Sequence, residues 1–176
     1  MAAQLEATYF IISGASSARR MPAVIDQLAP RVPSPIAVLS EHATRILSPR
    51  ELVLIEGVSV VESYFDEVIL PRPPDGLVLV APCTFNSLNK LATGIADTLA
   101  LSIGAEAIGR GTPVIVAPSV NDSLWAHPRT RQSIEVLLSW NVTVIPPVPD
   151  EDGRLTMAPD TTLIDAVLAA HRQEEG

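Results

Sequence analysis

Two kinds of segment alternate along the 176-residue chain. Short runs that are apolar at every position are followed by longer segments whose apolar residues recur at helical spacing. A run without apolar–polar alternation is typical of a strand buried on both faces, as in a parallel sheet covered by helices. The pattern therefore predicts six strands, at residues 9–12, 36–39, 67–70, 77–80, 114–116 and 142–145.

The segments between these strands carry the helical pattern. Strands that alternate with helices predict the α/β class, here a single doubly wound parallel sheet in a Rossmann or flavodoxin-like three-layer domain over residues 1–176. Right-handed crossovers then place helices on both faces of the sheet. The segment 146–160 is rich in proline, aspartate and glycine, and we expect a loop or substrate flap there. The expected helices cover residues 16–28, 41–46, 86–101, 105–109, 130–140 and 161–171.

Composition narrows the function classes. The chain has 12 basic and 20 acidic side chains, which give a formal net charge of −8, and it has no basic cluster that could follow a nucleic-acid backbone. No apolar stretch reaches the length that spans a membrane. The start of the sequence lacks the pattern of a secretory signal, and the single cysteine, Cys83, excludes an internal disulfide. We therefore expect a cytoplasmic protein that binds neither nucleic acid nor membrane.

Candidate chemistry lies where the strands end, because ligands of open parallel sheets bind beyond the carboxyl ends of the strands. The first strand runs into the small residues 13–18, which would let a phosphate approach backbone amides at a helix start. These residues match neither a dinucleotide fingerprint nor a P-loop, so a mononucleotide with one phosphate fits better. A plain strand-to-helix turn explains them equally well. Ser40, at the end of the second strand, is expected to cap a helix or to bind a phosphate.

The fourth and fifth strands each end in Ala-Pro, followed by a polar loop that carries asparagine. Thr84 and Asn86 follow the fourth strand, and Ser119 and Asn121 follow the fifth. Their neutral donors and acceptors suit the edge of a heteroaromatic ring or a substrate carboxylate.

The same two loops resemble those of the homo-oligomeric flavin-containing cysteine decarboxylases, a family that includes phosphopantothenoylcysteine and lantibiotic peptidyl-cysteine decarboxylases. Ala81–Leu99 resembles the family block Ala-Pro-x-[Ser/Thr]-x-Asn-[Thr/Ser]-[Leu/Ile]-x-Lys-[Ile/Leu]-Ala-x-Gly-Ile-Ala-Asp. Pro118–Trp125 is similar to the motif Pro-x-Met-Asn-x-x-Met-Trp, with Val120 and Leu124 in place of the two methionines. The likeness extends in order over residues 9–170.

The resemblance implies a cofactor, an activity and an assembly. The cofactor would be FMN, and the activity would be flavin-dependent oxidative decarboxylation of a small molecule or peptide with a cysteine-like end. Asn121 matches the family's asparagine that grips the substrate carboxylate. The family's trimers and dodecamers imply a homo-oligomer. The positions that match the family's flavin contacts are Gly14, Ala15, Ser16, Ser40, Thr84, Phe85, Asn86, Ser87 and Ser119.

Two departures from the family pattern bear on activity. The family's catalytic histidine precedes the fourth strand, where this chain has Glu67 or Val68. Glu67 is the candidate base, provided that burial raises its pKa, and a solvated residue at a strand edge is the alternative. The flap also lacks the cysteine of the pantothenoylcysteine branch. The alternative function is therefore a non-catalytic FMN-binding or regulatory protein of the same fold.

The remaining candidate residues are three histidines and the cysteine. The histidines show no metal-ligand spacing, so no metal site is expected. His42 is interpreted as an exposed first-turn residue and His127 as a turn residue that borders the site. His171 is expected to be exposed to solvent. Cys83 is interpreted as a small buried hydrophobic residue in the flavin loop.

Overall fold

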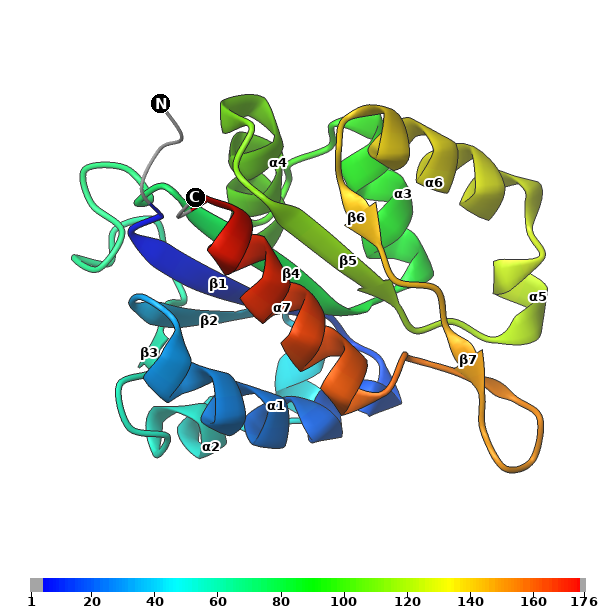
Figure 1. Ribbon diagram of the computed structural model, residues 1–176, viewed down its shortest axis with the longest axis horizontal. Helices are drawn as coiled ribbons and strands as arrows, with labels where there is room; N and C mark the ends of the chain where they lie inside the picture. Colours follow the sequence, from blue (N-terminus) through cyan, green and yellow to red (C-terminus); the bar gives the residue numbers. More distant parts are fainter. Residues whose placement is uncertain (1–4, 175–176) are drawn as a thin grey trace.

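A parallel sheet forms the centre of the protein in the computed structural model, which describes residues 5–174 (Figure 1). Its strand order is β3-β2-β1-β4-β5-β6, and every neighbouring pair is parallel. This confirms the predicted doubly wound, flavodoxin-like α/β fold. The strands are β1 (Ala7–Ile12), β2 (Pro35–Leu39), β3 (Ser59–Val60), β4 (Gly76–Cys83), β5 (Val114–Pro118) and β6 (Thr143–Val144).

Helices cover both faces of the sheet and bury two separate cores. One core lies under α1 (Met21–Leu28), α2 (Pro49–Val53) and α7 (Asp160–Glu174), where α1 and α7 lie side by side (Figure 1). The other lies under α3 (Phe85–Thr93), α4 (Leu99–Arg110) and α6 (Pro128–Ser139). Alternate residues of each strand enter opposite cores, and every position of β1 and β4 is buried. This two-sided burial explains why the strands are apolar throughout.

Short elements connect these layers. Three 3₁₀ helices, η1 (Ser16–Arg20), η2 (Ala29–Arg31) and η3 (Ala43–Arg45), occupy most of the remaining turns on the α1 side. The helix expected at 41–46 is therefore only the single turn η3, while α2 had no counterpart among the predicted helices. No helix among residues 5–174 is long and apolar enough to cross a membrane.

The strand predicted at 67–70 is wrong. These residues form turns, and the third strand is the two-residue β3 further upstream. The reason is local, because the Asp66 carboxylate accepts a hydrogen bond from the Val68 N–H at 3.0 Å, and the Asp66 carbonyl accepts one from the Ile69 N–H at 3.1 Å. Amides bound in this way are not free to join a ladder. Of the predicted strand residues, only Ile69 is buried.

The single helix predicted at 86–101 is also wrong, because the chain breaks it into α3 and α4. Gly94 adopts the left-handed conformation, with φ of 71°, and ends α3. Thr98 then begins α4 by accepting a hydrogen bond from the Leu101 N–H at 3.2 Å. Ile95, an apolar residue at helical spacing in the predicted helix, is 45% exposed. Helix α4 continues to Arg110 and absorbs the separate helix predicted at 105–109.

The segment 146–160 contains a small antiparallel hairpin. Its strands are β7 (Val148–Pro149) and β8 (Leu155–Thr156), which form a two-stranded sheet apart from the main one. The hairpin projects beyond the carboxyl end of the central sheet before the chain returns into α7 (Figure 1). Its use as a substrate flap stays a prediction.

The direction of winding reverses between β1 and β4. From β1 the chain builds outward through β2 to β3, and from β4 it builds the other way through β5 to β6. The connections that follow β1 and β4 therefore lead away from each other, which leaves a crevice beyond the carboxyl ends of these two strands. The loops that carry the predicted site residues meet there.

Candidate cofactor site

Ser13 joins the two halves of the sheet at the crevice. It is buried directly after β1, and its N–H and hydroxyl both donate to the carbonyl of Pro82, at 3.1 and 2.5 Å. The same hydroxyl accepts the Thr84 N–H at 2.9 Å. The hydroxyl proton and one oxygen lone pair are therefore committed to contacts within the fold. It fixes the end of β4 against the turn that follows β1.

The predicted phosphate turn, Gly14 to Ser16, lies against the loop after β2. A Cβ at Gly14 would lie 2.4 Å from the Cβ of His42, so glycine is required by the close approach of the two loops. The Ser40 N–H donates to the carbonyl of Ile12 at 2.9 Å, which brings Ser40 beside the same turn. Ser16 is exposed at the start of η1. The structure thus brings these predicted residues together.

Ser40 also has the capping role that the sequence left open. Its hydroxyl accepts a hydrogen bond from the Ala43 N–H at 3.2 Å, at the start of η3. A hydroxyl that accepts in this way still has its own proton to donate. Capping and phosphate binding are therefore compatible at Ser40.

A pair of hydroxyls connects the turn after β1 to the end of β5. The Oγ atoms of Ser17 and Ser119 lie 2.9 Å apart, and Ser17 is buried. The Ser119 N–H donates to the carbonyl of Cys83 at 2.9 Å, which seats Ser119 beside the end of β4. Sequence reasoning assigned a role to Ser119 but missed Ser17, because residues so far apart along the chain give no sign of their contact.

The loop after β4 begins α3 with a side-chain cap. The Thr84 hydroxyl accepts the Ser87 N–H at 3.3 Å and donates to the Ser87 hydroxyl at 3.0 Å. Asn86 is exposed on the first turn of this helix. A recess of about 70 Å³ opens between the ends of β1 and β4 and the starts of α3 and α4. Its polar lining comes from Ser13, Asn86, Ser87, Lys90 and Thr98.

Asn121 caps the short helix α5 (Asp122–Trp125) that follows β5. Its side-chain oxygen accepts the Leu124 N–H at 2.9 Å. The amide NH₂ of the same side chain has no hydrogen-bond partner among the described residues, and the residue is exposed. The cap therefore orients the amide and leaves two N–H donors for a ligand carboxylate.

His127 contacts the predicted flavin loop. Its ring meets the ring of Phe85 edge to face, with centroids 5.3 Å apart and planes at 76°. Its Nδ1 accepts the Arg129 N–H at 3.0 Å and so caps α6, which places the proton of the neutral ring on Nε2. His127 is thus the turn residue that was expected, and it also joins the loops after β4 and β5.

Glu67 is not brought to these residues by any contact. It lies in the segment between β3 and β4, where its side chain is exposed and makes no hydrogen bond or ion pair with the described part of the chain. Burial, the condition for its proposed use as a base, is therefore not met in a single chain. The strand edge expected around it is absent as well.

The expectation for His171 is wrong. It is buried on α7 at the opposite end of the sheet, and its Nε2 lies 2.9 Å from the Thr8 hydroxyl of β1. Thr8 is a rare polar position in a buried strand, and this contact satisfies its hydroxyl. No group of three His, Cys, Asp or Glu side chains within residues 5–174 could hold a metal ion.

The charges nearest the crevice are paired. Lys90, which lines the recess, places its Nζ 2.6 Å from Asp97, between the end of α3 and the start of α4. The hydrogen bond from Lys90, aided by its positive charge, lowers the pKa of Asp97. The predicted contact residues that face the crevice therefore offer neutral hydroxyl and amide groups rather than free cations.

The class of protein follows from this geometry. A doubly wound sheet with small and hydroxyl-bearing residues beyond β1, β2, β4 and β5 has the flavodoxin-like arrangement, in which ligands bind beyond the carboxyl ends of the strands. The sequence matches the model of the Flavoprotein family over residues 4–172, so the chain belongs to this family.

Curated relatives agree with the family. The chain is 29% identical over 177 residues to the phosphopantothenoylcysteine decarboxylase of Mus musculus, which covers 91% of this chain and 86% of that protein. It is 30% identical over 138 residues to the coenzyme A biosynthesis bifunctional protein CoaBC of Thermococcus kodakarensis. That match covers 75% of this chain but only 34% of the relative, so the chain spans about a third of that bifunctional protein.

Solved structures share the fold. The peptidyl-cysteine decarboxylase EpiD superposes with a TM-score of 0.77 at 18% identity and covers 93% of this chain and 99% of its own. The FMN binding protein AtHal3 superposes with a TM-score of 0.78 at 20% identity and covers 96% of this chain and 97% of its own.

Cys83 provides a test of the site's interior. It is fully buried, and burial raises the pKa of its thiol, which keeps the thiol protonated and unreactive. We predict that iodoacetamide modifies native Cys83 at least about a hundredfold more slowly than the denatured chain, because reaction requires local opening. Mass spectrometry of timed samples measures this directly, since Cys83 is the only cysteine. Rapid native labelling would instead support a redox role.

Proposed function

We propose that the protein binds FMN in the crevice beyond β1 and β4 and catalyses the oxidative decarboxylation of a cysteine-like thiol-carboxylate. The observation that carries the proposal is the meeting of four predicted loops at the reversal of the sheet, in a chain that belongs to the Flavoprotein family. Family relatives and structural neighbours named as cysteine decarboxylases or FMN binding proteins support it.

The residues present fit the phosphate end of such a cofactor. Gly14 lets the loops after β1 and β2 come into contact, and Ser16 and Ser40 offer hydroxyl donors beside it. Backbone amides and hydroxyls at a strand-to-helix turn are suited to a phosphate monoester. Thr84, Phe85, Asn86, Ser87 and Ser119 would hold the flavin ring.

Asn121 would position the substrate. Its free NH₂ can donate two hydrogen bonds to a carboxylate, while its oxygen remains committed to the α5 cap. Bound FMN would supply a two-electron acceptor for oxidation of the thiol to a thioaldehyde, which then loses CO₂ as a β-keto acid does. The overall change in the substrate is the loss of CO₂ and two hydrogens.

A second copy of the chain would complete the site. Leu54 and Phe65 are each 86% exposed and Val53 is 60% exposed, around a groove of about 520 Å³ that Val53 and Phe65 both line. Exposed apolar surface of this kind supports a homo-oligomer. The resemblance to the cysteine decarboxylases implies a trimer or dodecamer. Glu67, the candidate base, lies in the same segment as Phe65, so a copy that covers this face would bury its carboxylate.

Without that burial, the chain has no evident base. The exposure of Glu67 in the single chain and the missing family histidine favour the second candidate function, a non-catalytic FMN-binding or regulatory protein. Both candidates bind FMN. They differ in whether a thiol-carboxylate is turned over.

FMN binding is tested by reconstitution. We expect the purified protein to take up FMN, with a flavin absorbance spectrum and quenched flavin fluorescence. Gly14→Ala should weaken the FMN affinity about tenfold or more, because the new Cβ forces the loops after β1 and β2 apart. Gly109→Ala is the control, since a Cβ there meets nothing within 4 Å. Failure of the wild-type protein to bind FMN would refute the proposal.

Turnover is tested with Asn121→Asp. Aspartate caps a helix as well as asparagine does, so α5 and the thermal stability should be retained. The NH₂ donors are lost and a like charge faces the substrate carboxylate, so kcat/KM should fall about tenfold to a hundredfold. The assay follows loss of CO₂ and two hydrogens from a cysteine-ended peptide and from phosphopantothenoylcysteine. If the protein binds FMN but neither substrate loses CO₂ and two hydrogens, the result supports the non-catalytic function.

The oligomer is tested by sedimentation equilibrium. We expect the wild-type protein to sediment as a multimer and the double variant Leu54→Ser, Phe65→Ser to shift toward monomer. Leu138→Ser on α6 is the matched control, because Leu138 is 53% exposed but lies outside the 53–70 segment. A wild-type monomer at micromolar concentration would contradict the assembly.

A further inference from the structure

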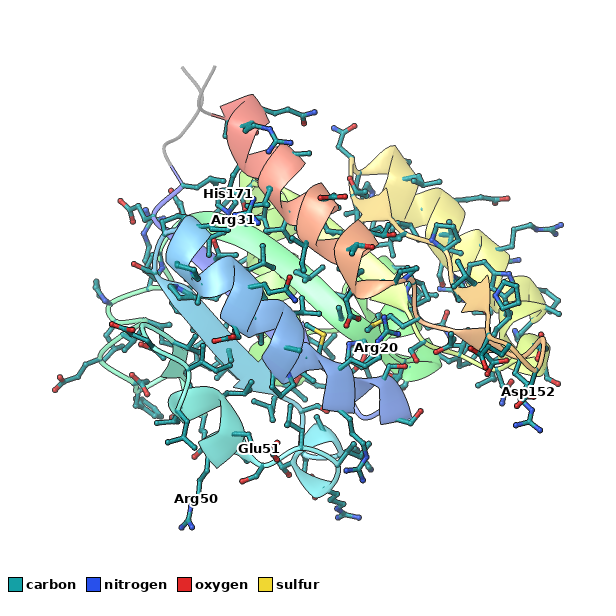
Figure 2. The ribbon with its side chains drawn as sticks, turned by 60° about the horizontal axis from the view of Figure 1, so that its bottom comes forward. Arg20, Arg31, Arg50, Glu51, Asp152 and His171 are labelled. Carbon is teal, nitrogen blue, oxygen red and sulfur yellow. The ribbon has the colours of Figure 1, made fainter. Side chains whose placement is uncertain are left out.

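Arg20 links the predicted phosphate turn to the hairpin. It is the last residue of η1, which begins immediately after Gly14 and Ala15. Its guanidinium makes four hydrogen bonds, and all of them go to the segment that returns from the hairpin into α7 (Figure 2). Asp160 Oδ1 accepts from Nε at 2.8 Å and from Nη2 at 2.5 Å. The Met157 carbonyl accepts from Nη1 at 3.0 Å, and the Ala158 carbonyl accepts from Nη2 at 2.7 Å.

The held segment is the base of the hairpin. Met157 and Ala158 are 0% and 1% exposed, directly after β8, and Asp160 is the first residue of α7. Neither carbonyl belongs to the β7–β8 pairing, which ends at Thr156. A planar guanidinium that donates to one carboxylate and two carbonyls fixes both the position and the orientation of the segment that carries them.

The tip of the hairpin keeps its shape by its own contacts. The Asp150 carboxylate accepts the Asp152 and Arg154 N–H groups, both at 2.9 Å, and the Asp150 N–H donates to the Arg154 carbonyl at 2.8 Å. Gly153 supplies the left-handed residue of the turn, with φ of 78°. The hairpin is therefore preformed, and the orientation of the whole unit depends on its base.

We infer that Arg20 is a positioning residue that couples the cofactor turn to the hairpin. Its donors point to Met157, Ala158 and Asp160, so its charge is matched within the fold and its task differs from binding the phosphate. A ligand that orders the turn after β1 also orders η1, and through Arg20 it steadies the hairpin. This coupling rests on the proposed FMN site. The four hydrogen bonds from Arg20, which we call the clamp, hold with or without a cofactor.

Limited trypsin digestion tests the clamp, because Arg154 stands at the tip with a side chain that is 78% exposed. Cleavage after Arg154 should be about tenfold or more faster in Arg20→Ala than in the wild type, since trypsin cleaves locally unfolded chain and release of the base lets the two short strands of the hairpin separate. Arg20→Lys keeps the positive charge but loses the planar guanidinium, so its rate of cleavage after Arg154 should lie between those of the wild type and Arg20→Ala. Arg19→Ala is the matched control, because Arg19 is exposed and makes no hydrogen bond or ion pair with the described residues.

Cleavage after Arg50 provides an internal reference. Arg50 lies on α2, far from the hairpin tip marked by Asp152 (Figure 2). A rise at Arg154 alone supports the clamp, and an equal rise at both sites would mean that Arg20 only stabilises the whole fold, which overturns the inference. Asp160→Asn removes the charge with little change of shape, and it should raise the Arg154 rate alone even if Arg20→Ala fails to fold.

The same samples separate the clamp from the cofactor. Flavin fluorescence reports FMN binding, and saturating FMN should slow Arg154 cleavage severalfold in the wild type but not in Arg20→Ala. If FMN does not bind, the proposed function fails, while the apo cleavage rates still test the clamp. If FMN binds and protects Arg154 equally in both proteins, Arg20 does not transmit the effect and the coupling is wrong.

Discussion

The pairing of β1 with β4 connects the two halves of the sheet, and Ser13 closes that pairing at the ligand end. Its hydroxyl holds Pro82 and Thr84 at once, so the turn after β1 and the start of α3 cannot separate. Both loops that define the crevice depend on this contact. The neighbouring loops after β2 and β5 are then attached by equally short-range contacts, Gly14 to His42 and Ser17 to Ser119.

Much of the fold could be predicted from the sequence, because two-sided burial gives each long strand a continuous apolar run. The errors arose where local contacts override that pattern. The Asp66 carboxylate binds the Val68 N–H and the Asp66 carbonyl binds the Ile69 N–H, so neither amide can join a strand at 67–70. Helical spacing runs unbroken through Gly94, so the spacing alone could not reveal a left-handed helix end that sends Ile95 outward. Hydrophobic periodicity indicates which face of a segment is buried. It gives little information about the backbone angles of an individual residue.

The candidate site was predictable where motifs lie on one strand end, as at Thr84 and Asn121. Contacts between distant segments, such as Phe85 with His127 or Arg20 with Asp160, could not be predicted from the sequence. The charges of Arg20 and Lys90 are matched by aspartates, and the predicted contact residues themselves offer neutral donors. Hydroxyls and amides discriminate by geometry, and their interactions with an anion are less sensitive to ionic strength than those of a free cation.

The two polar atoms of the Asn121 side chain have different surroundings. Its oxygen caps α5, and its nitrogen is left to the solvent. This division restricts how the position can evolve. Serine, threonine and aspartate would all begin α5 equally well, yet none of them carries an NH₂ group. A substitution at this position would therefore leave a protein that folds normally but lacks the two donors proposed for a substrate carboxylate, so its loss would not be detected by a measurement of stability alone.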